Sequence, residues 1–74
     1  MLADMSGQTN VEYRVDIYNA RHIEIASRRF HARNERAALA AGAAMVTALG
    51  GAHGTVLVLD GGREEYVDSV EATR

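Results

Sequence analysis

The sequence contains no cysteine, no lysine and no proline, and it has one phenylalanine. Without cysteine, neither a disulfide framework nor a thiolate metal site is available, so stability must come from packing within the chain or across a dimer interface. Without a proline-rich linker or an internal repeat, one domain is expected. No apolar run approaches the roughly 18 residues that span a bilayer, and MLADMSGQTN lacks the regions of a signal peptide, which favours a cytoplasmic location.

With 74 residues the chain has little room for a deep substrate cleft, which favours a binding module over an enzyme. No HExxH, P-loop or dinucleotide motif is present, so we expect no catalytic residue, no cofactor and no metal. His22 and Glu24 lie two residues apart, a spacing that is common by chance, and the direction of His31 depends on the position of a bulge. These three residues are therefore interpreted as surface residues and not as the three protein ligands that a catalytic zinc site usually needs. His53, between glycines, is expected to cap the C-terminus of a helix.

The charges are divided along the sequence, although the net charge is only −2. Residues 21–36 contain five Arg against two Glu, and residues 60–74 contain five acidic residues against two Arg. All eight basic residues are Arg, whose guanidinium suits bidentate contacts with carboxylates and phosphates. A biased genome composition explains this usage equally well, and the net charge disfavours general nucleic-acid binding.

Two strands are predicted in the first half of the chain. VEYRVDIY (11–18) alternates apolar and polar residues, as a strand with one buried face does. HIEIASRRFHA (22–32) alternates again, but Ile23 and Ile25 occupy odd positions whereas Phe30 and Ala32 occupy even ones. A β-bulge near Ser27 would bring all four onto the core side.

A helix is predicted from Glu35 to Leu49, with Asn34 as N-cap and a Gly-Gly stop. Its core stripe is expected to contain Leu39, Gly42, Met45, Val46 and Leu49. The opposite side consists of small uncharged residues, and the whole stretch 37–59 has no charge. This face predicts self-association through Ala37, Ala40, Ala41, Ala44 and Ala48, although alanine is also the best helix former.

TVLVL (55–59) is a continuous apolar run typical of a central strand with both faces partly covered, and REEYVDSVEA (63–72) has the charges of an edge strand. The predicted fold class is therefore α+β, with order ββαββ. We expect a four-stranded antiparallel sheet in spatial order 2-1-3-4 and one helix packed on one face. Residues 1–10 are expected to be flexible, and 11–74 to form the single domain.

The arrangement YRVDIY, HIEIASRRF, ERAALAAGAAMVTALGG and TVLVLDGGREEYV resembles a bacterial and phage family of short ββαββ domains of unknown function. In length, acidity and layout the chain is also similar to certain phage anti-CRISPR proteins. This resemblance implies a stoichiometric inhibitor that occupies a surface of a CRISPR effector complex, where DNA would bind. It implies the host cell cytoplasm as its location if the protein is phage-encoded.

The expected function is binding to a protein partner. Acidic residues would imitate phosphates toward a basic groove, and arginines would bind acidic rims. These partner-binding residues are Asp60, Glu64, Glu65, Asp68, Glu71, Arg28, Arg29 and Arg33. Two alternatives stay open: a nucleic-acid-binding module that uses the Arg-rich second strand, and a homodimeric accessory protein. The arginines could equally form solvated pairs with acidic residues of the last strand.

Overall fold

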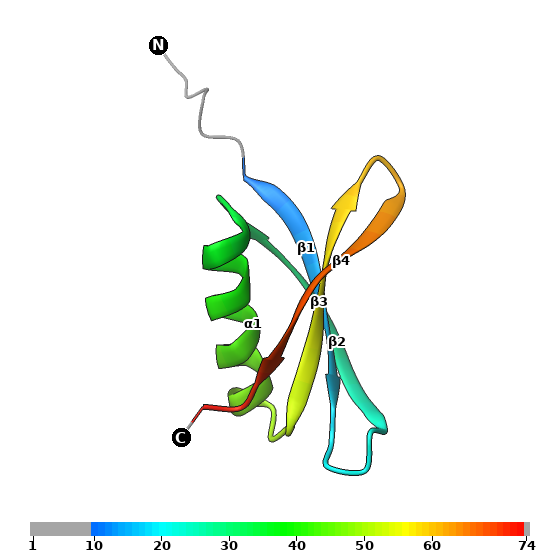
Figure 1. The fold of residues 1–74 in the computed structure, drawn as a ribbon, viewed down its shortest axis with the longest axis vertical. Coiled ribbons are helices and arrows are strands. Elements are labelled where there is room, and N and C mark those ends of the chain that lie inside the picture. Colours follow the sequence, from blue (N-terminus) through cyan, green and yellow to red (C-terminus); the bar gives the residue numbers. More distant parts are fainter. Residues whose placement is uncertain (1–9, 74) are drawn as a thin grey trace.

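The computed structural model describes residues 10–73, in which one hairpin precedes the helix along the chain and another follows it, and the helix lies on one side of the sheet that the hairpins form (Figure 1). The elements are β1 (Val11–Tyr18), β2 (Glu24–Ala32), α1 (Glu35–Ala48), β3 (His53–Asp60) and β4 (Arg63–Glu71). All neighbouring strands are antiparallel, in the order β2-β1-β3-β4, and α1 packs on one face of the sheet. This confirms the predicted α+β fold with order ββαββ. Most of the predicted flexible N-terminus, residues 1–9, lies outside the described residues.

The two hairpin turns are built from different local chemistry. Gly61 and Gly62 join β3 to β4 with φ values of 59° and 87°, the left-handed conformation that a two-residue hairpin loop requires. Between β1 and β2, the side-chain oxygen of Asn19 accepts hydrogen bonds from the backbone nitrogens of Arg21 and Ile23, at 2.8 and 3.1 Å. This turn extends further than predicted, so β2 begins at Glu24.

Both ends of α1 are closed as its sequence predicts. The side chain of Asn34 accepts a hydrogen bond from the backbone nitrogen of Ala37 at 2.8 Å. At the other end, the backbone nitrogen of Gly51 donates to the carbonyl of Val46 at 2.8 Å, and Gly50 has a φ of 75°. This is a Schellman motif, and it ends the helix at Ala48, one residue before the predicted end.

The core lies between α1 and one face of the sheet. Its fully or nearly buried residues are Tyr13, Val15, Ile17, Ala32, Ala38, Val46, Val56 and Val70. The helix lies close to the sheet because Gly42 faces it: a Cβ at this position would be 2.8 Å from Cγ2 of Val56. No helix among residues 10–73 has the length and apolar character needed to cross a membrane.

The predicted core stripe of the helix was wrong in part. The buried positions are Ala38, Gly42 and Val46, whereas Met45 is only half-buried and Leu49 is 40% exposed. The close approach at Gly42 turns the smallest side chains toward the sheet and leaves larger ones at the margins of the contact. Alanine therefore serves the core of this protein as well as its surface.

The predicted β-bulge exists, but its position was wrong. The partners of Ile17 and Tyr18 are Ala26 and Glu24, so Ile25 is the extra residue instead of one near Ser27. As a result Phe30 and Ala32 do lie on the helix side, while Ile25 is 44% exposed and does not join the core. Ile23, also expected in the core, is 55% exposed. A second bulge, which was not predicted, leaves Val67 as the extra residue of β4.

Candidate functional site

The sheet face opposite α1 is not covered by any other element among residues 10–73. Residues that lie opposite each other on neighbouring strands point to the same face of the sheet. The residues of this surface are therefore the polar positions of β1 and the residues paired with them, strand by strand, across the sheet. We call it the open face. It comprises Glu12, Arg14, Asp16 and Tyr18 of β1; Glu24, Ser27, Arg29 and His31 of β2; His53, Thr55, Leu57 and Leu59 of β3; and Glu64, Tyr66, Ser69 and Glu71 of β4.

Arg14 is the central side chain of the open face. Its guanidinium contacts both carboxylate oxygens of Asp16, at 2.9 and 3.2 Å, and both of Glu64, at 2.6 and 3.2 Å. Since β3 lies between β1 and β4, the Arg14–Glu64 contact reaches across β3 at the level of Leu57 and Leu59. This bridge accounts for the half-buried state of both leucines on a face that carries no helix.

The electrostatics of Arg14 follow from these contacts. The hydrogen bonds that Arg14 donates to Glu64, and then those to Asp16, raise the pKa of Arg14 above its ordinary value. Ser27 extends the network to the edge strand β2, because its hydroxyl donates to Asp16 Oδ1 at 2.8 Å. The polar centre of the open face is therefore held in one arrangement by contacts among three strands.

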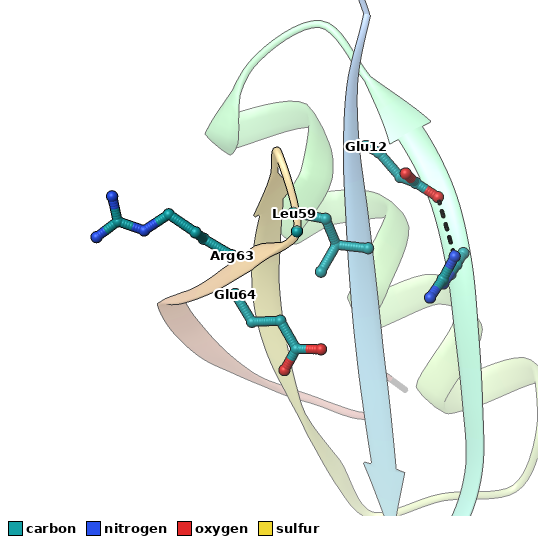
Figure 2. A pocket seen from close by; sticks show the side chains of 6 residues that line it. Glu12, Leu59, Arg63 and Glu64 are labelled. Carbon is teal, nitrogen blue, oxygen red and sulfur yellow. Dashed lines mark ion pairs between the residues drawn. The ribbon is translucent and has the colours of Figure 1, made fainter.

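The open face contains one shallow hollow of about 210 Å³ near the turn between β3 and β4 (Figure 2). Glu12, Arg29, Leu59, Gly62, Arg63 and Glu64 line it. In Figure 2 the carboxylate of Glu12 is joined to a guanidinium, the 3.9 Å contact with Arg29, whereas the side chain of Arg63 extends away from the sheet. The hollow is smaller than typical ligand pockets of at least about 300 Å³ and is lined by both signs of charge, which suits a side chain of a protein partner better than a small substrate.

At the opposite end of the open face, His22 and His53 form a pair. Nδ1 of His22 lies 3.2 Å from Nε2 of His53, and the ring of His53 stacks on Tyr18 at 5.4 Å between centroids. His53 was expected to cap the helix, and this was wrong: it begins β3, while Gly50 and Gly51 close the helix. The two ring nitrogens are at hydrogen-bond distance, and the tautomers decide which of them donates. Among residues 10–73 no group of three or more His, Cys, Asp or Glu side chains could hold a metal ion.

The acidic residues singled out from the sequence do not form one patch. Glu64 and Glu71 lie on the open face, whereas Glu65 and Asp68 lie opposite Val58 and Val56 on the other face. Asp60 stands at the turn, opposite Arg63. Glu64 and Glu65 are separated by the alternation of the strand, and the bulge at Val67 then places Asp68 on the helix side and Glu71 on the open face.

The arginines singled out from the sequence are divided in the same way. Arg29 lies on the open face, near Glu12, while Arg28 lies opposite Val15 on the helix side and donates to the carbonyl of Ser27 at 2.9 Å. Arg33 follows the end of β2 and is exposed. The Arg-rich segment therefore does not present a single basic stripe.

The alanine face of the helix is narrower than the sequence indicated. Ala40, Ala44 and Ala48 are exposed, whereas Ala37 and Ala41 are half-buried. Three exposed alanines form a strip along α1 on the side away from the sheet.

The sequence pattern did not lead us to expect Glu12, Arg14 and Asp16 as functional residues, although their alternation with core residues was visible in it. The alternation of VEYRVDIY already places Glu12, Arg14 and Asp16 together on the face opposite the core. Counted from the ladder, the open face has five carboxylates against two guanidiniums. Three of the five carboxylates lie on β1 and β2 together with both guanidiniums, so most of the acidic excess comes from Glu64 and Glu71 of the C-terminal hairpin.

Comparison of the chain with models of protein families, with curated proteins and with solved structures finds no significant match. The class of protein is therefore defined by its own fold and surface: an α+β domain with order ββαββ and one acidic open sheet face.

Proposed function

We propose that this protein is a non-enzymatic protein-binding module and that the open face is its contact surface. The single observation that carries the proposal is the composition of this face, with its acidic excess and its prearranged Arg14 bridge above Leu57 and Leu59. A flat, partly apolar surface with fixed polar groups suits protein recognition, since fewer side chains must be ordered on binding.

In its specific form, the proposal is that the protein acts as a phage-type inhibitor, similar to anti-CRISPR proteins. It would occupy a surface of a nucleic-acid-handling effector complex and block its DNA binding in the cytoplasm. The carboxylates of Glu12, Glu24 and Glu71 support this form, because they spread negative charge over all but one of the strands and could replace phosphates in a basic groove.

The proposal is tested by competition between this protein and DNA for purified effector complexes, chosen by nuclease-treated affinity capture from the host lysate. We expect the wild-type protein to displace DNA in a salt-sensitive manner. Glu71→Lys, on the open face, should weaken displacement at least about tenfold, as expected for a lost interfacial charge pair. Glu65→Lys is the matched control, since it changes the same charge on the other face of the same strand.

Three results would contradict the proposal. The first is the absence of any displacement from a captured complex, and the second is an equal loss in the two Glu→Lys variants. The third is direct, steeply salt-dependent binding of bare DNA or RNA, which would favour the Arg-rich second strand as a nucleic-acid interface.

A further inference from the structure

Both edges of the sheet are available for pairing. In the order β2-β1-β3-β4, the outer strands β2 and β4 each have one paired neighbour within residues 10–73. Each has nine residues, so the two edges are matched in length. Half of the backbone donors and acceptors of an edge strand point outward and can pair with another strand.

The two edges carry opposite charge. In β2, Arg28 and Arg29 outnumber Glu24. In β4 there are four carboxylates, Glu64, Glu65, Asp68 and Glu71, against Arg63. Pairing of β2 with β2, or of β4 with β4, would bring like charges together, whereas pairing of β2 with β4 brings opposite charges together.

The direction of the strands also favours contact between unlike edges. Each neighbouring pair in the sheet is antiparallel, so β2 and β4 run in opposite directions. A second copy in the same orientation therefore presents its β2 antiparallel to β4 of the first. We propose that the protein associates with itself head to tail, through β4 of one copy and β2 of the next.

One register of this contact preserves the faces of both strands. It places Asp68 opposite Arg28 on the helix side, and Tyr66 opposite Arg29 on the open face. Glu64 then lies opposite His31, and the extra residue Val67 is accommodated as it already is against β3. All these side chains except Val67 are exposed in the single chain. The pairing thus combines an ion pair, a cation–π contact and a charge-assisted hydrogen bond.

The exposed apolar side chains of the edges support the same contact. Tyr66 on β4 is 62% exposed and Ile25 on β2 is 44% exposed. The register also brings Glu71 near Glu24, beside the bulge, which opposes pairing at that end. Association is therefore expected to depend on protein concentration and to weaken as salt screens the ion pairs. Such a head-to-tail contact produces a ring or an open chain of copies.

The test is sedimentation velocity over a series of protein concentrations at low ionic strength. Wild-type protein should associate, and Arg28→Asp and Asp68→Arg alone should each weaken association by about tenfold or more, since each converts an attractive cross-strand pair into a repulsive one. An equimolar mixture of the two variants should associate again, because each supplies the charge that the other has lost. Arg36→Asp, an equal charge change on the exposed surface of the helix, is the control.

The same variants distinguish pairing of the sheet edges from association through the helix. A wild-type protein that stays monomeric at every concentration, or a mixture of the two variants that does not recover, would overturn the proposal. Association that Arg28→Asp and Asp68→Arg leave unchanged but Ala44→Glu abolishes would instead assign self-association to the alanine strip of α1. Circular dichroism of each variant shows whether it is folded, and the mixture keeps the result decisive if one variant is merely less stable.

Discussion

At the scale of single residues, Arg14 shows how a charged residue can organise a surface without being buried. It lies in β1, which contributes the buried residues Tyr13, Val15 and Ile17 to the core, yet its side chain points to the open face and reaches two carboxylates on different strands. The exposed fraction is 21% for the Arg14 side chain and 49% for that of Glu64, so solvent screens the pair in part. We therefore expect a measurable but modest contribution to stability.

A double-mutant cycle with Arg14→Met and Glu64→Gln should give a coupling energy of about 0.5–1 kcal/mol in urea unfolding, and the coupling should fall at high salt. Methionine keeps an apolar stem above Leu57, so the cycle reports the ion pair. The same cycle with Arg29→Met and Glu12→Gln is the control. Its N–O distance is 3.9 Å with a 70% exposed arginine, and its coupling should be near zero. Equal coupling in both cycles would contradict a specific role of Arg14.

Tyr13 predicts how stability changes at alkaline pH. Burial, and then the charge of Glu35, raise the pKa of Tyr13 above its ordinary value of 10.0. The neutral phenol is thus favoured in the folded state. The stabilisation that comes from keeping the Tyr13 phenol neutral is present in full below pH 10. It is lost as the pH rises above 10 and passes the pKa that Tyr13 has in the folded protein.

Urea unfolding between pH 8 and pH 11 should therefore show a decline above about pH 10 that is smaller in Tyr13→Phe than in wild type. Tyr66→Phe is the matched control, because it removes the same hydroxyl from a side chain that is 62% exposed and lies outside the core. If the alkaline decline is identical in wild type and Tyr13→Phe, another group is responsible for it.

At the scale of elements, the close contact between α1 and the sheet is set by small residues. Gly42 allows the approach from the helix, and Gly54 allows it from β3. A Cβ on Gly54 would lie 2.8 Å from Cγ2 of Val46 and 3.1 Å from both the backbone oxygen of Asp16 and Cγ2 of Val15. Backbone atoms and β-branched side chains cannot move away easily at this position.

Gly54→Ala should therefore lower the free energy of unfolding by about 2 kcal/mol, the cost of overpacking a well-packed core. Gly61→Asn is the matched control. Gly61 has a φ of 59° with open space around it, and asparagine tolerates this conformation. The substitution Gly61→Asn should therefore lower the free energy of unfolding by no more than about a few tenths of a kcal/mol. Both values come from chemical denaturation, and equal losses would show that the helix does not lie as close to β3 as described.

The elements also show where the sequence was sufficient and where it failed. Asn34, Gly50 and the alternation of VEYRVDIY act locally, and they predicted the caps and β1 correctly. The location of the first bulge was wrong because Ile25 is displaced by the long turn around Asn19, which the sequence did not reveal. Leu49 was placed in the core by its hydrophobicity, but the helix has already ended at that point.

At the scale of the whole molecule, one helix covers one face of a four-stranded sheet. This leaves the open face and the two edge strands uncovered, and these are the surfaces that we propose for a partner and for other copies of the chain. The two proposed contacts share some open-face residues of β2 and β4, but the variants that test them change different groups: Glu71 on the open face for the first, and Arg28 with Asp68 on the helix side for the second. They should therefore be separable by mutation.

We expect Asp68→Arg to lose self-association while it still displaces DNA from the captured effector complex, and Glu71→Lys to lose displacement while it still associates. Sedimentation and competition assays on the same preparations measure both properties. Loss of both properties in each variant would mean that the partner binds only an assembled form of the protein. An unchanged competition result with Asp68→Arg is expected because Asp68 does not lie on the open face.

The sequence by itself determined the order of the elements, the ends of the helix and the two blocks of opposite charge, since each of these depends on neighbouring residues. Only the tertiary structure decided which charges share a surface. A side chain in a strand changes face with every one-residue shift, so the bulge at Val67 places Asp68 on the helix side and Glu71 on the open face, and the bulge at Ile25 places Glu24 on the open face with Arg29. The strand order then placed the basic and acidic blocks at opposite edges of the sheet, because β1 and β3 pair with each other in its centre.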